Sequence, residues 1–446
     1  MSMRRLVVGG VAVFLALSAC TPGSTADAPD ERSAGEVTTD VAKLGEVTLT
    51  VWDQEVRGGQ EKQISALNAE FERRYPNITI DRVSRSFDDL RDTVKNGLSG
   101  ADGPDVTQVN NGRQDMGAFV KAGLLQPLDG YAEAYDWTGR FPDSVRGLAS
   151  YPETGDSLGD GKLYGLPQTG ELVGVYYNKG KLTQLGIQPP KTWAEFDAAL
   201  ATTKTAGELP IQFGNLDKSG GPYLLALNMH RSGKPKDEAA LATGRAAATW
   251  LADPWRDAAG KLVGWVDNGY LTPGFAGLSG DDAWANFAKG QGVFLVSGTW
   301  LVPDLSAAMG DQVGFLLPPA TDGAVSVTGG TGLPWAISGK SEHPDAAAAY
   351  IDFITSLKAM KVLADNGNLP VLDADKQQVT GLASEVFAAW QQASNSPGLV
   401  PYLDYATPDA YDVISGAVEQ LLGKRTGVED CLGTLQEDLD ANRGGR

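Results

Sequence analysis

Two clusters of polar side chains follow predicted strands of this 446-residue chain. Asp53-Gln54-Glu55 comes directly after the alternating, β-branched run 47–52, and Asn110-Asn111 ends a strand that opens at Pro104-Asp105-Val106. Ligands of open α/β sheets bind outside the carboxyl ends of the strands. Both clusters are therefore candidate ligand contacts, although Asp and Asn are equally suited to cap helices and to form turns.

Aromatic residues supply a second kind of recognition chemistry. Trp300 ends a predicted strand, Tyr223 starts a predicted helix, and Tyr402 and Tyr405 lie in a proline-flanked loop. Sugar rings present apolar C–H faces and a rim of hydroxyls, so they suit an aromatic platform with planar Asp, Glu, Asn or Gln groups around it. We interpret Trp300 as facing a cleft. We assign the following aromatic residues to the core: Trp137, Trp193, Trp250, Trp265, Trp284, Trp335, Trp390, Tyr176 and Tyr177.

Several kinds of catalytic chemistry have no residues to carry them. The only histidines are His230 and His343, which disfavours a histidine metal cluster and a Ser-His-Asp triad. There is no G-x-S-x-G, P-loop or G-x-G-x-x-G sequence. We therefore expect no catalytic residues, no metal and no cofactor. A paired-carboxylate glycosidase stays open, because its acids need no fixed spacing.

The amino-terminal residues predict export. Residues 1–5 are basic, and residues 6–17 form an apolar run that is too short to span a bilayer. Small residues then precede Cys20, which is typical of a signal peptide over residues 1–19. The Cys resembles that of the bacterial lipobox, whose diacylated thiol gives a stable membrane anchor. Residues 20–43 are poor in apolar side chains, and we expect a flexible tether.

The remaining composition agrees with an extracytoplasmic protein. The net charge of −19 argues against nucleic acid or an anionic membrane surface as a partner. Cys431 is the only other cysteine, so a chain lipidated at Cys20 has no disulfide, and Cys431 is expected to be buried. We expect a monomer that contacts the membrane only through its lipid anchor.

The stretch 161–196 divides the chain into two halves. A turn and a short segment ending at Pro167 lead into a predicted strand over 172–177. A Pro-Pro break then precedes a helix whose start carries a capping box, with Thr192 at N-cap and Glu195 three residues later. A single strand with an irregular approach, placed between two α/β-like halves, indicates a crossing between two lobes.

The flanking halves alternate strands and helices, which predicts an α/β fold. Strands at 47–52 and 78–83 with a helix between them form a β-α-β unit and imply a parallel sheet. A further helix is expected over 116–125 and a loop-rich stretch over 128–141. Later strands are expected at 209–213, 292–296 and 313–317, and residues 328–337 are glycine-rich at first and then apolar. Later helices are expected at 222–231, 238–267 with an interruption at Asp253-Pro254, 281–289, 344–357, 358–366, 382–392, 411–422 and 428–439.

Read together, seven stretches resemble the extracellular solute-binding proteins of ABC sugar importers, the maltose-binding-like family. Each is weak alone, but their order and spacing are specific, and they cover most of 47–422. They are ALNAEFERRYPNITI (66–80), LSGADGPDV (98–106), AFVKAGLLQPLD (118–129), GKLYGLPQ with VYYNK and LGIQPPKTWAEF (161–196), GQGVFLVSGTW (290–300), GGTGLPWAIS (329–338) and HPDAAAAYIDFITS with GNLP (343–370).

The resemblance implies a two-lobed α/β fold of the periplasmic-binding-protein type II kind, with a ligand cleft between the lobes. The lobes are expected at 44–168 with 332–370 and at 171–329 with 372–446, joined by crossings near 168–172, 330–333 and 369–372. The partners that it implies are a sugar ligand and the permease subunits of an ABC transporter. Family ligand positions carried onto this chain are Gln54, Glu55, Asn110, Asn111, Gln168, Thr169, Asn215, Tyr223, Trp300, Gly330, Thr331, Tyr402 and Tyr405.

Two other functions stay open at this point. In many relatives the loop after the PDV sequence carries a carboxylate or an aromatic residue, whereas this chain has Asn110-Asn111, so the ligand's identity is open. The same fold could bind an amino acid or peptide through Arg57 or Arg113. A secreted glycoside-processing enzyme is the second alternative.

Overall fold

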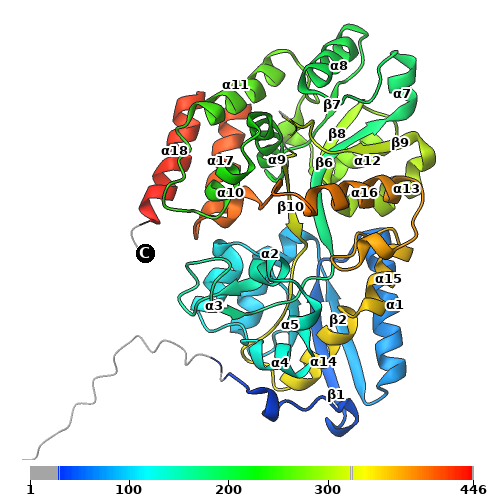
Figure 1. Ribbon diagram of the computed structural model, residues 1–446, viewed down its shortest axis with the longest axis vertical. Coiled ribbons are helices and arrows are strands. Elements are labelled where there is room, and N and C mark those ends of the chain that lie inside the picture. Colours follow the sequence, from blue (N-terminus) through cyan, green and yellow to red (C-terminus); the bar gives the residue numbers. More distant parts are fainter. Residues whose placement is uncertain (1–28, 30, 322, 324, 444–446) are drawn as a thin grey trace, which may run out of the picture.

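The computed structural model describes residues 29, 31–321, 323 and 325–443, which form two α/β lobes (Figure 1). The predicted signal peptide and Cys20 lie outside the described residues. The amino-terminal lobe is the lower one in Figure 1, and the carboxyl-terminal helices lie in the upper lobe. None of the described helices is both long enough and apolar enough to cross a bilayer.

A four-stranded sheet forms the centre of the lower lobe. Its order is β11-β3-β1-β2, and β1 pairs in parallel with both β2 and β3, while β11 is antiparallel to β3. The predicted β-α-β unit is confirmed, with α1 joining β1 to β2. The strands are β1 (Val47–Asp53), β2 (Ile78–Ser84), β3 (Val106–Gln108) and β11 (Trp335–Ile337). The last strand returns to this lobe from far along the chain.

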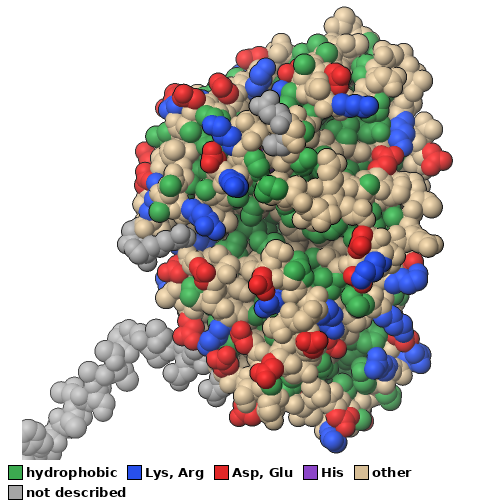
Figure 2. Space-filling model, in the orientation of Figure 1, with side chains coloured by type: hydrophobic (Ala, Val, Ile, Leu, Met, Phe, Trp, Pro, Cys, Tyr) green, Lys and Arg blue, Asp and Glu red, His purple; other side chains and the backbone are tan. Residues whose placement is uncertain are grey.

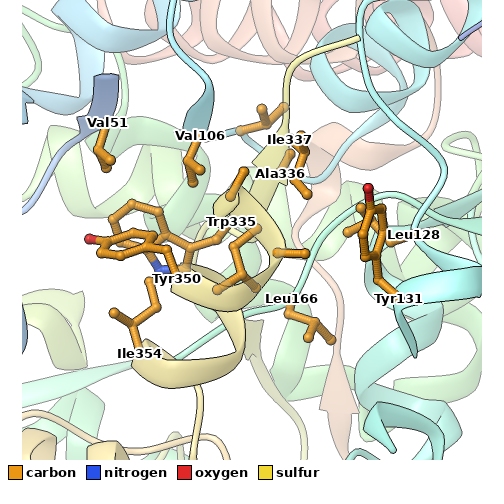
Figure 3. Packing of buried hydrophobic residues seen from close by; sticks show 14 of the residues in the cluster. Val51, Val106, Leu128, Tyr131, Leu166, Trp335, Ala336, Ile337, Tyr350 and Ile354 are labelled. Atoms are coloured by element: carbon orange, nitrogen blue, oxygen red, sulfur yellow. The ribbon is translucent and has the colours of Figure 1, made fainter. Parts of the chain in front are cut away.

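The core of the lower lobe lies between this sheet and the helices that cover it (Figure 3). Phe71, Trp335 and Tyr350 are fully buried there, and Phe71 and Trp335 each pack edge-on against Tyr350. The prediction that Trp335 belongs to the core is confirmed. The helices of this lobe are α1 (Gly58–Arg74), α2 (Phe87–Ser99), α3 (Ala118–Lys121), α4 (Asp129–Ala134), α5 (Trp137–Arg140), α6 (Asp143–Arg146), α14 (Pro344–Ile354) and α15 (Leu357–Asp365).

The upper lobe contains a larger, mixed sheet with β6 at its centre. The main order is β12-β10-β6-β8-β7, and β9 also pairs with β6. All three neighbours of β6 are antiparallel to it, whereas β7 and β12 pair in parallel with β8 and β10. The strands are β6 (Gly170–Asn178), β7 (Ile211–Gln212), β8 (Phe294–Gly298), β9 (Val313–Leu316), β10 (Val327–Thr331) and β12 (Leu399–Val400).

Helices cover both faces of this upper sheet. One core cluster forms where α9, α11, α17 and α18 pack together, and the other forms where α13 and α16 pack on β6 and β9. The capping box of α8 is confirmed: the Thr192 hydroxyl accepts from the Glu195 N–H. The helices are α7 (Lys179–Gln184), α8 (Trp193–Thr205), α9 (Gly220–Met229), α10 (Pro235–Ala242), α11 (Asp253–Asp267), α12 (Gly280–Ala288), α13 (Val302–Met309), α16 (Leu382–Ser394), α17 (Ala410–Leu422) and α18 (Val428–Ala441).

Three segments run side by side where the lobes join. In β6 and β10, Glu171 pairs with Gly330 and Gly170 pairs with Thr331. The Gly332 N–H donates to the Thr169 carbonyl oxygen at 3.0 Å, and a Cβ on Gly332 would lie 2.1 Å from Thr169 Oγ1, so any larger residue there would force the Thr169 side chain to move. The third segment joins through a bridge between residues 169 and 370. Leu372 packs in the lower core, so the upper lobe resumes only after it.

Three expectations about local structure were wrong. The helix expected over 238–267 is two helices, α10 and α11, separated by the non-helical residues 243–252. The stretch 128–141 is not loop-rich but holds α4 and α5, because Tyr131 and Trp137 are fully buried and anchor these short helices. The helix expected over 116–125 is a short π turn over Arg113–Gly117 followed by α3. Gly123, in the left-handed region at φ 65°, follows the end of α3.

The expected tether was also wrong in its second half. Residues 34–36 and 41–43 form short 3₁₀ turns, and Val41 is buried in the lower core. Arg32 Nη1 donates to Asp345 Oδ1 at 2.9 Å, and the Thr38 N–H donates to Asp345 Oδ2 at 3.1 Å. The buried Asp345 gives this polar segment an attachment point on α14, which composition alone does not reveal.

Candidate ligand-binding site

A cavity lies between the lobes and in front of the crossing strands. It holds about 1400 Å³ of space, part of it open to solvent. Figure 2 shows a hollow with hydrophobic side chains between the two halves of the molecule. Residues of both lobes and of β6 and β10 line the cavity. A ligand held there touches both lobes and the segments that join them.

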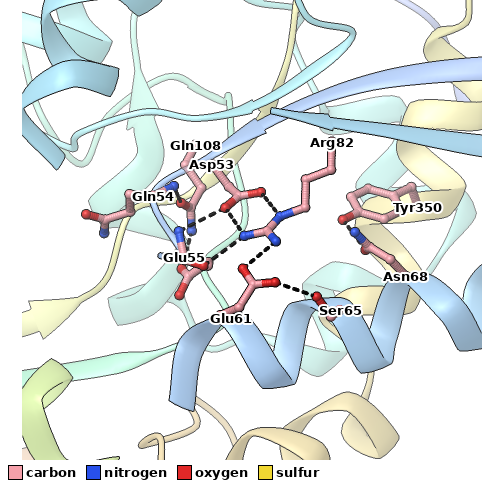
Figure 4. Close-up of polar contacts among 9 residues, drawn as sticks. All are labelled: Asp53, Gln54, Glu55, Glu61, Ser65, Asn68, Arg82, Gln108 and Tyr350. Atoms are coloured by element: carbon pink, nitrogen blue, oxygen red, sulfur yellow. Dashed lines mark hydrogen bonds and ion pairs between the residues drawn. The ribbon is translucent and has the colours of Figure 1, made fainter. Parts of the chain in front are cut away.

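A network of charges fixes the loop at the end of β1 (Figure 4). Asp53 is fully buried and accepts two hydrogen bonds from Arg82, at 2.6 and 2.8 Å. The Arg82 guanidinium also reaches Glu61 at 2.6 Å and the Glu55 carbonyl oxygen at 2.8 Å. This bidentate pairing holds the loop rigid, and Gln54 then lines the cavity.

Glu55 belongs to this network rather than to the cavity wall. Its Oε1 accepts from Gln108 Nε2 at 2.7 Å, and Gln108 Oε1 accepts from the Gln54 N–H at 2.8 Å. Burial raises the pKa of the Glu55 carboxyl to about 7, against the lowering effect of the Gln108 hydrogen bond. Glu55 therefore supports the loop from behind.

Asn110 and Asn111 line the cavity from the end of β3. Asn110 Nδ2 donates to Asp115 Oδ2 at 2.9 Å, and Asn111 Nδ2 donates to the Leu148 carbonyl oxygen at 2.8 Å. These bonds hold both amides in place at the wall. The two readings of this cluster, turn residues and ligand contacts, are therefore compatible.

Four aromatic rings form one wall on the upper lobe. The centroid of Tyr223 lies 5.9 Å from that of Trp300 and 6.3 Å from that of Tyr402, and the centroid of Tyr402 lies 5.7 Å from that of Tyr405. A Cβ on Gly298 would lie 1.9 Å from the Trp300 ring, so the glycine before this turn lets the indole fold back. All four residues, which the sequence analysis named as candidate ligand contacts, line the same cavity.

Glu171 is a wall residue that the sequence reasoning missed. It lies on β6, and its Oε2 accepts a hydrogen bond from the Tyr402 hydroxyl at 3.0 Å. Burial raises the pKa of this carboxyl to about 7. The signal was present, because Glu171 is the only charged residue of β6, whose other residues are mostly apolar. Burial likewise raises the pKa of Asp404, also on the wall, to about 6.

Several buried polar groups of the wall have no hydrogen-bond partner among the described residues. They are both polar atoms of the Gln212 amide, Gln60 Oε1, the Tyr411 hydroxyl and the Ser415 hydroxyl. Buried polar groups in proteins are nearly always hydrogen-bonded. The wall therefore suits a ligand that carries many donors and acceptors.

The structure divides the thirteen predicted ligand residues into two sets. Those on the cavity wall are Gln54, Asn110, Asn111, Tyr223, Trp300, Thr331, Tyr402 and Tyr405. Those that lie off the wall are Glu55, Gln168, Thr169, Asn215 and Gly330. The second set supports the fold locally. Gln168 Nε2 donates to the Ile354 carbonyl oxygen at 2.5 Å, and Asn215 Oδ1 accepts from the Gly221 N–H in the first turn of α9 at 2.8 Å.

Two further expectations change. Among the residues of the crossings, Glu171, Thr331 and Leu333 line the cavity, and of these only Thr331 was predicted; Gln168 and Thr169 do not reach it. Trp284, expected in the core, lies on the wall, where its Nε1 donates to Asp281 Oδ1 at 3.0 Å. Its place on the first two turns of α12 points it toward the cleft.

The lobes touch each other on both sides of the cavity. On one side Arg57 Nη2 donates to Asp281 Oδ1 at 2.9 Å, across from the start of α1 to α12. On the other, Gln114 Nε2 donates to Asp412 Oδ2 at 2.8 Å, and Arg113 Nη1 donates to the Ala406 carbonyl oxygen at 2.7 Å. This arrangement is a closed one. Both arginines considered for a zwitterionic ligand are thus engaged by protein groups.

No cluster of three or more His, Cys, Asp or Glu side chains suited to a metal ion occurs within residues 31–321 and 325–443. Both histidines, His230 and His343, have structural roles. His230 is buried, its Nε2 accepts from the Thr328 N–H at 3.0 Å, and its Nδ1 lies 2.5 Å from Glu238 Oε2. His343 is the N-cap residue of α14.

Comparisons with known proteins agree with this architecture. The multiple sugar-binding protein of Streptococcus mutans is 23% identical over 335 residues, covering 74% of this chain and 76% of that one. The galactooligosaccharide-binding protein of Bacillus subtilis is 22% identical over 97% of this chain and 94% of its own. A solved chitin oligosaccharide binding protein has a TM-score of 0.74 and 22% identity, covering 89% of this chain and 100% of that one.

A protein family matches most of the described chain. Residues 58–361 match the family described as bacterial extracellular solute-binding protein. This range runs from the start of α1 to within α15 and includes every strand of the two large sheets except β1 and β12. The two-lobed α/β fold and the matched family together identify the chain as a member of the bacterial extracellular solute-binding proteins.

Proposed function

We propose that this protein binds a sugar or oligosaccharide in the cleft and delivers it to the permease of an ABC importer. The observation that carries the proposal is the wall itself. Four clustered aromatic rings face a cavity whose rim holds amide, hydroxyl and carboxyl groups, several without protein partners among the described residues. Rings with apolar faces and many hydroxyls fit both features at once.

The relatives support the class of ligand. The names of the Streptococcus mutans, Bacillus subtilis and solved relatives refer to multiple sugars, galactooligosaccharides and chitin oligosaccharides, respectively. These names describe different sugars. They favour a carbohydrate for this chain without selecting one.

Binding would favour the closed arrangement of the lobes. Residues 44–168 with 332–372 would move as one body and residues 171–329 with 373–443 as the other. A ligand in contact with Gln54 and Asn110 on one side and with Trp300 on the other makes its full set of contacts only when the lobes are closed. It therefore shifts the population toward the closed form, by as much as its affinities for the two forms differ.

A thermal-shift screen tests the proposed ligand class. Purified protein would be mixed with mono-, di- and oligosaccharides and, as the competing class, with amino acids and short peptides. We expect stabilisation by one or a few carbohydrates and by none of the amino acids or peptides, because specific binding raises the melting temperature. Stabilisation by an amino acid or peptide alone would contradict the proposal.

The same samples test the proposal against a glycoside-processing enzyme. The cavity carboxyls Glu171 and Asp404 are acids with raised pKa values, a property that glycosidases also use. A binding protein returns its sugar unchanged. Chromatography after long incubation with excess sugar should recover the intact ligand, and multiple turnovers would identify an enzyme instead.

Location and anchoring are part of the proposal. The signal sequence and Cys20 support an exported lipoprotein held on the outer side of the cell membrane by its lipid anchor. Replacing Cys20 by serine (Cys20→Ser) should move the protein from the membrane fraction to the soluble one. Retention of this variant on membranes would refute lipidation at this cysteine.

A further inference from the structure

Two consecutive glycines open helix α1 of the lower lobe. Gly58 and Gly59 are its first two residues, and Gly59 is buried. Glycine is among the poorest helix formers, because it loses the most backbone freedom on folding. Its use twice in one helical turn therefore calls for a reason outside the helix, and the close approach of another segment is such a reason.

The segment that approaches is the first turn of α13, in the upper lobe. A Cβ on Gly59 would lie 2.2 Å from Cβ and 2.5 Å from Cγ of Pro303. Separations under 3.0 Å are essentially never found around a real Cβ atom. The proline ring is fixed to its own backbone, so it cannot turn away as a flexible side chain would. Any larger residue at position 59 would therefore force the starts of α1 and α13 apart.

The upper lobe also supplies a hydrogen-bond acceptor to the start of α1. The N-cap residue, Arg57, makes no side-chain capping hydrogen bond. The first N–H groups of a helix have no acceptor within the helix, and here the Gly58 N–H donates to Asp304 Oδ1 at 3.2 Å. Arg57 itself pairs with Asp281 of α12 at 2.9 Å. Three successive residues of the lower lobe thus contact the upper lobe.

The contact between these two helix starts lies beside the cavity but not on its wall. Gln60 and Leu301, which are neighbours of the contact in sequence, line the cavity, whereas the residues of the contact do not. A change in the contact can therefore alter the relative position of the lobes without removing a wall residue. We call it the α1–α13 contact, and it consists of Gly58, Gly59, Pro303 and Asp304.

We propose that the α1–α13 contact is a steric stop that sets how far the two lobes close, and that Gly59 is a positioning residue for closure. This inference rests on the proposed closing of the lobes and adds what limits it. In the closed arrangement Pro303 occupies the space that a side chain at position 59 would need. A side chain there disfavours the closed form, and a ligand that needs both lobes binds more weakly in consequence.

Disulfide trapping on the opposite side of the cavity tests the inference without a ligand. Gln114→Cys with Asp412→Cys, in the soluble Cys20→Ser protein, replaces the two side chains whose Nε2 and Oδ2 atoms lie 2.8 Å apart in the closed arrangement. Two thiols form a disulfide only when they are close, so the rate of oxidation reports the closed population. Adding Gly59→Ala should lower this rate by at least about fivefold. Absence of any disulfide in the parent pair would contradict the closed arrangement and the inference with it.

Gly97→Ala is the matched control for Gly59→Ala. Its Cβ would lie 2.5 Å from the Trp52 ring, but both residues belong to the lower lobe, so opening the lobes cannot relieve the clash. It should change the trapping rate by less than about twofold. Pro303→Gly removes both atoms that the added methyl group would strike, and its addition to Gly59→Ala should raise the rate again. A fall of less than about fivefold in Gly59→Ala, an equal fall in Gly97→Ala, or no recovery with Pro303→Gly would overturn the inference.

A second variant keeps the test decisive if Gly59→Ala does not fold, as judged by circular dichroism. Asp304→Ala removes the acceptor of the Gly58 N–H and leaves the cavity wall intact. It should lower the trapping rate by about twofold or more, because the closed form alone loses a hydrogen bond. An unchanged rate in this variant would then overturn the inference.

Titration with maltose, cellobiose and raffinose separates the inference from the function on which it rests. Any of these sugars that binds the wild type should bind Gly59→Ala at least about fivefold more weakly, with Gly97→Ala close to wild type. Equal affinities of Gly59→Ala and the wild type would overturn the inference and leave the proposed function intact. If no carbohydrate binds the wild type, the proposed function is contradicted, and the trapping rates alone decide the inference.

Discussion

The Tyr402 hydroxyl donates a 3.0 Å hydrogen bond to Oε2 of Glu171, across 231 positions of the chain. Tyr402 belongs to the aromatic wall, and Glu171 lies on β6, directly opposite Gly330 of the second crossing strand. The contact thus joins the wall of the cavity to the segments that connect the lobes. A ligand that changes the hydrogen bonding of this pair acts on the crossing strands directly.

Replacement of Glu171 by glutamine should stabilise the protein more at high pH than at low pH. The carboxyl has a pKa of about 7 in the folded protein, above the ordinary value of 4.5, so the folded state keeps a proton that the unfolded state releases. This group therefore lowers the free energy of unfolding as the pH rises from about 4.5 to about 7. Glutamine does not titrate and still accepts from Tyr402.

The stability of Glu171→Gln relative to the wild type should rise by about 1–2 kcal/mol between about pH 5 and pH 8, after allowing for water in the cavity. Urea denaturation at both pH values measures this difference. Glu195→Gln, at an exposed capping position on α8, serves as the control and should not show this rise. A relative stability of Glu171→Gln that stays flat with pH would mean that Glu171 titrates normally.

Replacement of Trp300 by alanine should weaken binding of the cognate sugar by about tenfold to a hundredfold, because the ring supplies the apolar face of the site. The loss would appear as a smaller ligand-induced thermal shift or none. Trp193→Ala is a suitable control, since Trp193 is also half-buried but lies on α8 off the cavity wall. It should change stability and leave affinity intact. Undiminished binding by Trp300→Ala would remove Trp300 from the site.

Replacement of Arg82 by alanine should destabilise the protein by about 3–5 kcal/mol, because it leaves the fully buried Asp53 carboxylate unpaired. Chemical denaturation measures the loss. Arg73→Ala offers a matched comparison: Arg73 pairs with Glu70 on the surface, where solvent screens the pair, so its loss should cost far less than the loss of Arg82. Similar costs for the two variants would show that the network behind β1 is not a stabilising centre.

Replacement of Asp412 by alanine should weaken ligand binding by about two- to fivefold without touching the cavity wall. Asp412 on α17 contacts Gln114 and Arg91 of the other lobe, so its loss lowers the population of the closed form. Stopped-flow fluorescence should show faster ligand release. Asp409→Ala, an exposed neighbour without a described contact to the other lobe, should behave as wild type, and equal effects of the two would argue against a closing contact.

The local elements and part of the site follow from sequence pattern. Alternating β-branched residues and a helical stripe predicted β1, α1 and β2, and residues at strand ends such as Gln54 and Trp300 reached the cavity. These predictions succeeded because strand ends and helix starts are local features. The aromatic rings were found because large apolar side chains at such ends have little reason to be there unless they face a cleft.

The remaining features depend on contacts between distant parts of the chain. Glu171 was missed because its partner Tyr402 is brought to it only by the packing of β12 beside β10. Asn215 looked like a ligand residue, yet its side chain is used by the first turn of α9. Residues 31–43 looked like a free tether, and only the position of Asp345 shows where they attach.

Calorimetric titration of the purified protein with the carbohydrate found in the thermal-shift screen tests the central claim most directly. We expect one sugar to bind per chain, full recovery of the sugar after the titration, and loss of the binding heat in Trp300→Ala. Binding to sites outside the cleft would leave the heat of Trp300→Ala unchanged. That result, or conversion of the sugar to products, would contradict a protein that holds its ligand between two closing lobes.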